Sequence, residues 1–174
     1  NEAVKAVKAK DFRHAVTLFA MQAESHQHDA QYNLALLLEA GKGTPQNFLK
    51  ALDWAWSAQL GGIKDAGELA EDLKDILPEA YVLEAQNLVK TRLKARIDDG
   101  DIRAITQFAQ YNLIILEEPD YETAYIWYSI GAALGLGGTI EARDNAREKV
   151  EDEKVIDLQR EAGTIYENLS KKLN

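Results

Sequence analysis

The stretch AQYNL at residues 30–34 recurs unchanged at residues 109–113. Five identical residues in the same order would hardly arise by chance in a chain of 174 residues, so the chain is internally duplicated. Downstream of this stretch the two copies stay aligned without gaps at an offset of 73 residues, from the glycines at 62 and 135 to the threonines at 91 and 164. Self-similarity of this kind indicates an architecture of stacked repeats, and here the repeat unit is long.

A second pattern marks the beginnings of three related helices. Asp11, Asn47 and Asp120 are each followed by an aromatic residue at the next position, by alanine at the fourth and by a large residue at the seventh. Asp and Asn side chains can accept hydrogen bonds from the free N–H groups of a first helical turn. The small alanine lets a neighbouring helix approach closely. The sequence therefore predicts that a helix begins after each of these three residues.

Helical spacing continues through the rest of the chain. Apolar residues recur every three or four positions, and no segment shows the alternation typical of a strand. Clusters of Gly, Pro and Asp separate these segments, where helices are expected to end. The predicted helices are residues 2–9, 12–25, 29–40, 47–60, 64–76, 79–97, 102–117, 120–134, 139–150 and 152–172. We predict an all-α fold, a right-handed α/α superhelix (solenoid) of about ten antiparallel helices.

The expected organisation is a single domain over residues 1–174. Residues 1–28 form an N-terminal capping pair of helices, residues 29–97 the first repeat unit and residues 101–174 the second. Each unit contains an A helix (29–40 and 102–117), a B helix (47–60 and 120–134) and an extra hairpin. A chain of this length can bury about 70% of the surface that its unfolded form exposes, so it needs neither disulfides nor a structural metal.

Composition excludes several classes of protein. The chain has no cysteine, which removes Cys-ligated zinc, iron–sulfur clusters and thiol chemistry. Its net charge of -9 disfavours nucleic acid and anionic membranes, and we find no local basic patch that would offset it. No apolar run approaches the roughly 20 residues of a spanning helix, so no membrane insertion is predicted. Because the chain begins at Asn1 rather than Met, a removed leader and another removed N-terminal portion both fit the sequence.

Residues 29–62 resemble a Sel-1-like repeat, a family related to the tetratricopeptide repeat. The family's small, leucine, glycine, Lys-Ala and tryptophan positions are occupied by Ala30, Leu34, Gly41, Gly43, Lys50, Ala51, Trp54, Ala58 and Gly62. The resemblance covers residues 29–66 and, less fully, residues 108–142. In the second copy the Gly-x-Gly loop is shortened to residues 117–119. Ala35 in the first copy and Ile114 in the second stand where the family usually has glycine. The resemblance implies a protein-interaction scaffold, frequently of the bacterial envelope, and therefore a periplasmic or exported location, with the cytoplasm as the alternative.

The resemblance also places the two A helices on a concave surface. A carboxamide there can bond both the N–H and the C=O of an extended peptide, which makes Asn33 and Asn112 candidates. The alternative is a structural asparagine bonded to a neighbouring helix or loop. The predicted partner-binding residues are Tyr32, Asn33, Leu36, Trp56, Tyr111, Asn112 and Ile115.

The tryptophans divide into two groups. Trp54 and Trp127 match the structural tryptophan of the family, so we expect both in the core. Trp56, two positions from Trp54, must point to another face of the same helix, which makes it the better recognition candidate. Tyr125 and Tyr128 flank Trp127 in the same way, which suggests a surface aromatic patch on the B helices.

No catalytic residue, metal or cofactor is predicted. His26 and His28 lack a third ligand, and residues 98–101 lack the ligand pattern of a calcium loop and are better read as a helix stop followed by a helix cap. No nucleophile with its base and no phosphate loop is present. The predicted function is a non-enzymatic scaffold that binds a protein or peptide on its concave face. Two alternatives are an architectural or self-associating component of an envelope complex, using the aromatic patch, and a glycan-acting hydrolase or its accessory module with a carboxylate pair in the groove.

Overall fold

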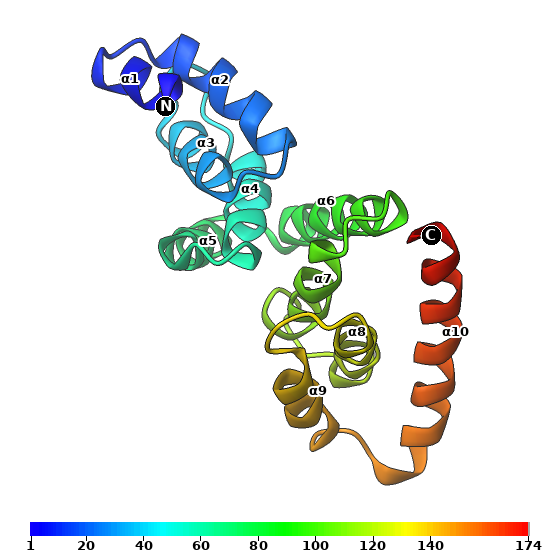
Figure 1. Cartoon of the computed structure of the whole chain (residues 1–174). Helices are drawn as coiled ribbons and strands as arrows, with labels where there is room; N and C mark the ends of the chain where they lie inside the picture. The colour runs from blue at the N-terminus through cyan, green and yellow to red at the C-terminus, as the bar shows by residue number, and fades with distance from the viewer. Residues whose placement is uncertain (174) are drawn as a thin grey trace. The chain divides into compact units, whose positions relative to one another are not determined.

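A computed structural model describes residues 1–173, and every regular element in that range is helical (Figure 1). The elements are α1 (Glu2–Lys8), α2 (Phe12–Glu24), α3 (His28–Ala40), α4 (Phe48–Leu60), α5 (Lys64–Ile76), α6 (Glu79–Asp98), α7 (Arg103–Ile114), α8 (Tyr121–Ala133), α9 (Thr139–Arg147), the 3-10 turn η1 (Asp152–Lys154) and α10 (Val155–Leu173). The predicted all-α helical repeat is confirmed. The helices lie within a few residues of the predicted ranges, the largest differences being the earlier ends of α7 and α9 and the later start of α10. The hand of the superhelix stays a prediction.

The chain forms two compact units, divided between Val89 and Lys90 in the middle of α6. In unit 1, α1 packs on α2, α2 on α3, α3 on α4 and α4 on α5. In unit 2, α7 packs on α8 and α8 on α9, and α10 returns to pack on α8. None of the helices in the described chain combines the length and hydropathy that a membrane crossing requires.

The three predicted helix beginnings are present. The side chain of Asp11 accepts a hydrogen bond from the N–H of His14 (3.2 Å), Asn47 does so from Lys50 (2.9 Å), and Asp120 from Thr123 (2.9 Å). The alanine four positions after each cap has no exposed surface: Ala15, Ala51 and Ala124. Each of these helices therefore begins and packs as the pattern predicts, because the cap satisfies a free N–H and the alanine permits close contact.

The A–B turns of the two copies close differently. In the first, Gly41 ends α3 with φ 65° and Gly43 follows with φ 79°, and a Cβ on Gly43 would overlap the carbonyl of Phe12. Only glycine fits such a close approach. In the second copy the shortened loop has no left-handed glycine, and the N–H of Asp120 donates directly to the carbonyl of Asn112 (2.8 Å).

Gly61, which ends α4, lies against the ring of His28. A Cβ on Gly61 would overlap that ring, whose Nδ1 lies 2.9 Å from Oε1 of Gln31. We expect Gly61→Ala to lower the free energy of unfolding by about 1–3 kcal/mol, the usual cost of overpacking, because the ring must leave its place. Urea unfolding followed by circular dichroism measures this loss.

Gly163 in the middle of α10 provides the matched control. A Cβ there would meet no atom within 4 Å, so Gly163→Ala is expected to raise stability by about 0.5–1 kcal/mol through helix propensity alone. Equal effects of the two substitutions would contradict the packing of His28 on Gly61.

Candidate functional site

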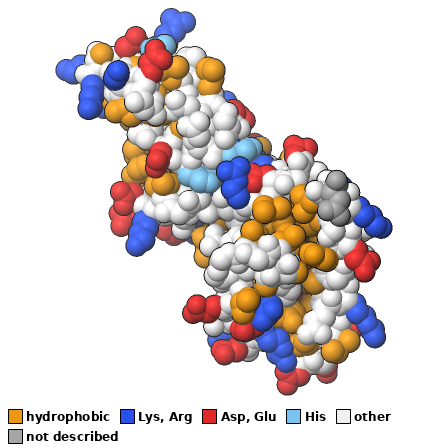
Figure 2. Space-filling model, viewed as in Figure 1, with side chains coloured by type: hydrophobic (Ala, Val, Ile, Leu, Met, Phe, Trp, Pro, Cys, Tyr) orange, Lys and Arg blue, Asp and Glu red, His pale blue; other side chains and the backbone are white. Residues whose placement is uncertain are grey.

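A cavity of about 360 Å³ opens in unit 2 among the second half of α6, α7, α8 and α10. Hydrophobic side chains gather over the space that α7, α8 and α10 enclose (Figure 2). We call this cavity the cleft. The A helix of the second copy contributes Phe108, Tyr111 and Asn112 to its lining. Two of the predicted partner-binding residues, Tyr111 and Asn112, therefore meet here.

Three aromatic rings form the floor of the cleft. Phe108 stacks on Tyr111 with ring centroids 5.9 Å apart, and it forms a T-shaped contact with Trp127 with centroids 5.1 Å apart and an interplanar angle of 85°. Phe108 and Tyr111 are buried, whereas Trp127 is only partly buried. Burial raises the pKa of the Tyr111 hydroxyl to about 12, so this floor carries no charge at neutral pH.

The repeated asparagines have the same conformation in both copies. Asn33 Nδ2 donates to the carbonyl of Asp29 and Asn112 Nδ2 to the carbonyl of Phe108, each at 2.7 Å and one turn back on the same helix. Neither side-chain amide forms, within the described chain, the bond to a neighbouring helix or loop that the structural alternative expects. At the cleft, the amide of Asn112 keeps a second N–H and its Oδ1 for a ligand.

The remaining predicted residues are dispersed. Leu36 is exposed on α3, and Tyr32 is partly exposed on the same helix. Burial and the charges of Asp65 and Glu68 raise the pKa of Tyr32, which places it beside the acidic surface of α5. Ile115 is 2% exposed, directly after α7, and lies in the core. Whether these residues bind a partner stays a prediction.

The expected surface aromatic patch is wrong. Trp56 is 1% exposed, and Tyr125 and Tyr128 are 5% exposed each. The reason is that every residue of α4 from 51 to 58 is buried, so the face that Trp56 occupies is covered as fully as the face of Trp54. The architectural alternative loses the feature on which it rested. Trp127, expected in the core, is partly exposed, in contrast to its neighbours Tyr125 and Tyr128.

The cleft also contains two carboxylates, Asp120 and Glu161. A pair of this kind was the condition for a glycan-acting hydrolase. Both oxygens of Asp120, however, accept hydrogen bonds from Thr123, Oδ1 from its N–H (2.9 Å) and Oδ2 from its hydroxyl (2.6 Å). Asp120 therefore caps α8, and whether the two carboxylates act on a glycan stays a prediction.

Two lysines of α6 complete the lining, and sequence reasoning missed both. Lys90 and Lys94 lie one turn apart, and Lys94 Nζ is 5.8 Å from the centroid of the Phe108 ring. Neither forms an ion pair within the described chain. The sequence feature that could have indicated them is the composition of residues 85–97, which contain four basic residues and no acidic residue.

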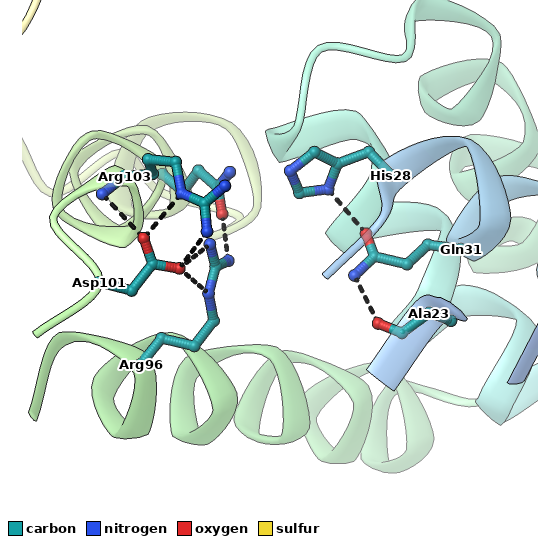
Figure 3. Close-up of polar contacts among 7 residues, drawn as sticks. Ala23, His28, Gln31, Arg96, Asp101 and Arg103 are labelled. Atoms are coloured by element: carbon teal, nitrogen blue, oxygen red, sulfur yellow. Dashed lines mark hydrogen bonds and ion pairs between the residues drawn. The ribbon is translucent and has the colours of Figure 1, made fainter. Parts of the chain in front are cut away.

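A buried polar network holds α6 beside α7 (Figure 3). Arg96, with its side chain 7% exposed, donates to Asp101 Oδ2 through Nε (3.0 Å) and Nη2 (2.7 Å), and to Gln107 Oε1 through Nη1 (2.6 Å). Asp101 also binds Arg103 Nε at 2.9 Å and accepts from the backbone N–H of Arg103 at 3.2 Å. The N-cap position of α7 is Ile102, so the predicted cap is displaced by one residue, and Asp101 just before it bonds the first N–H of the helix. By holding α6 beside α7, the network places Lys90 and Lys94 next to the aromatic floor of the cleft.

The histidines have structural contacts. His28 Nδ1 lies 2.9 Å from Gln31 Oε1, and Gln31 Nε2 donates to the carbonyl of Ala23 at 3.2 Å, which joins the end of α2 to α3 (Figure 3). Within the part of the chain that the structure describes, no three His, Cys, Asp or Glu side chains come together as a metal site would require.

The model of the Sel1 repeat family matches residues 28–55 and 115–136. The chain carries Sel1 repeats. The first Sel1 repeat spans α3, the Gly41–Gly43 turn and the first part of α4, and the second spans α8 with the loop before it. Trp127 belongs to the second Sel1 repeat, whereas Lys90 and Lys94 lie outside both. None of the curated proteins matches the chain.

Proposed function

We propose that this Sel1-repeat chain is a non-enzymatic module that binds a segment of a partner protein in the cleft beside α7, the A helix of the second copy. Sel1 repeats mediate interactions between proteins, which supports the general function. The observation that carries the finer proposal is the convergence of Tyr111, Asn112 and the partly exposed Trp127 on one cavity. An apolar floor with a few convergent polar groups is typical of binding sites.

Asn112→Ala tests this proposal. Peptides from a randomised decapeptide library that bind the wild-type chain are expected to bind the variant at least tenfold more weakly, because the amide that meets their backbone is gone. Stability should fall by no more than about 1 kcal/mol, since the lost bond goes to a carbonyl inside α7. Fluorescence anisotropy measures the affinity, and circular dichroism the melting temperature.

The equivalent amide of the first copy provides the control. Asn33→Ala removes the same bond on α3, outside the cleft, and is expected to leave the affinity for these peptides almost unchanged. A collapse of the melting transition in Asn112→Ala would show that the asparagine is structural. Peptides that bind Asn112→Ala as tightly as wild type would show that the cleft is not the peptide-binding site.

A further inference from the structure

The two lysines of the cleft stand out in an acidic chain. The net charge is -9, and other basic residues of unit 2 have acidic partners, among them Arg96 with Asp101 and Lys154 with Glu122. Lys90 and Lys94 have none within the described residues, yet both line the cavity. Residues four apart lie on the same face of a helix, so α6 presents both ammonium groups to one side of the cleft.

The carboxylates of the cleft lie on other walls than the two lysines. Asp120 lies at the N-terminus of α8, where both its oxygens accept hydrogen bonds and the positive end of the helix stabilises its charge. Glu161 belongs to α10, a separate wall, and pairs with neither lysine. The cleft therefore combines a cationic wall on α6 with an aromatic floor on α7 and α8.

Its size limits the occupant. A volume of about 360 Å³ is near the lower end of the roughly 300–1,000 Å³ typical of ligand pockets. It admits a side chain or two of an extended segment and not a helix. A side chain that covers Trp127 and Phe108 must be apolar, and the group that reaches Lys90 and Lys94 must be anionic.

We infer that the occupant of the cleft is an extended segment of a partner protein in which an Asp or Glu side chain stands beside a large apolar residue. This inference rests on the partner-binding function proposed above. The apolar side chain lies on Trp127 and Phe108, the carboxylate is bound by Lys90 and Lys94, and the amide of Asn112 bonds the backbone of the segment. Charge complementarity selects an acidic segment even though the chain as a whole is acidic.

The experiment uses random decapeptides displayed between two linkers, so that no displayed peptide has a free C-terminus. Binders are selected on the wild-type chain, synthesised with acetylated and amidated ends, and measured against three variants. Asn112→Ala identifies the peptides that depend on the cleft. Lys90→Gln with Lys94→Gln removes the two charges, and Lys149→Gln removes an exposed lysine of unit 2 that lies outside the cleft.

The expected binders carry Asp or Glu within two positions of Leu, Ile, Met, Phe or Trp. The double lysine variant should bind them about tenfold more weakly, roughly threefold per exposed ion pair, whereas Lys149→Gln binds them within twofold of wild type. Raising the salt concentration should weaken wild-type binding and leave the double variant almost unchanged. The double variant should still fold, because both lysines are exposed.

Two results would contradict the inference that the ligand is acidic and would leave the proposed partner-binding function standing. One is a set of peptides that depend on Asn112 but contain no acidic residue or ignore the double lysine variant. The other is binding that requires a free C-terminal carboxylate and is lost on amidation. If no selected peptide depends on Asn112 at all, the proposed function fails, which separates the two failures.

Discussion

Trp56→Ala is expected to lower the free energy of unfolding by about 3–5 kcal/mol, the usual cost of emptying a buried tryptophan site. The side chain is 1% exposed, and α4 packs against both α3 and α5. Its removal leaves a cavity that the surrounding helices cannot close completely. Chemical unfolding followed by circular dichroism gives the loss, and peptide binding at the cleft of unit 2 provides a second measurement on the same protein.

Leu36→Ala on the neighbouring helix is the control for this substitution. Leu36 is 37% exposed, so its truncation is expected to cost less than about 1 kcal/mol. Unchanged stability in Trp56→Ala would mean that the indole is accessible in solution, and would restore the interpretation of Trp56 as a recognition residue. A loss comparable to that of Leu36→Ala would point the same way.

The order and type of the helices were predictable because local signals decide them. Asp11, Asn47 and Asp120 cap their helices, and the alanine four positions later is buried in each case. Glycines 41 and 43 mark the first A–B turn, since the backbone there is left-handed. These features depend on a few neighbouring residues, and the repetition of the pattern within the chain reinforces each of them.

The exposure of particular aromatic residues was not predictable in the same way. Helical spacing shows that Trp54 and Trp56 point to different faces, but does not show which faces other helices cover. On α4 both are covered. On α8, Trp127 occupies the position equivalent to buried Trp54, yet it borders the cleft. The difference comes from tertiary packing, which the repeat pattern does not encode.

Lys90 and Lys94 were not predicted as part of the site for a related reason. Basic residues at 90, 92, 94 and 96 spread around α6, so the segment does not look like a basic patch. Arg96 turns inward to Asp101 and Gln107, while Lys90 and Lys94 line the cleft. Only the packing of α6 beside α7 separates their roles, and the buried network of Arg96 maintains that packing.

Asp101 is the acidic partner on which this network depends. Burial raises the pKa of its carboxyl, but hydrogen bonds from Arg103 and Arg96 and their positive charges outweigh this effect and lower the pKa from 3.8 to about 2. Arg96 is the buried member, whereas the side chain of Arg103 is 76% exposed and contributes little stability. Removing Asp101 would therefore leave the guanidinium of Arg96 buried without its counter-charge.

We expect Asp101→Asn to lower the free energy of unfolding by about 3 kcal/mol at pH 7, because breaking a buried pair is costly. Because the folded-state pKa is depressed, the stabilisation by the carboxylate is complete above about pH 4 and is lost as the pH falls towards 2. The difference between wild type and variant should therefore shrink by roughly 2 kcal/mol over this range, measured by urea unfolding at each pH. Arg96→Met with Asp101→Leu should recover most of the stability, since it leaves no buried charge. A difference that is constant with pH would show that the negative charge of Asp101 does not contribute to stability.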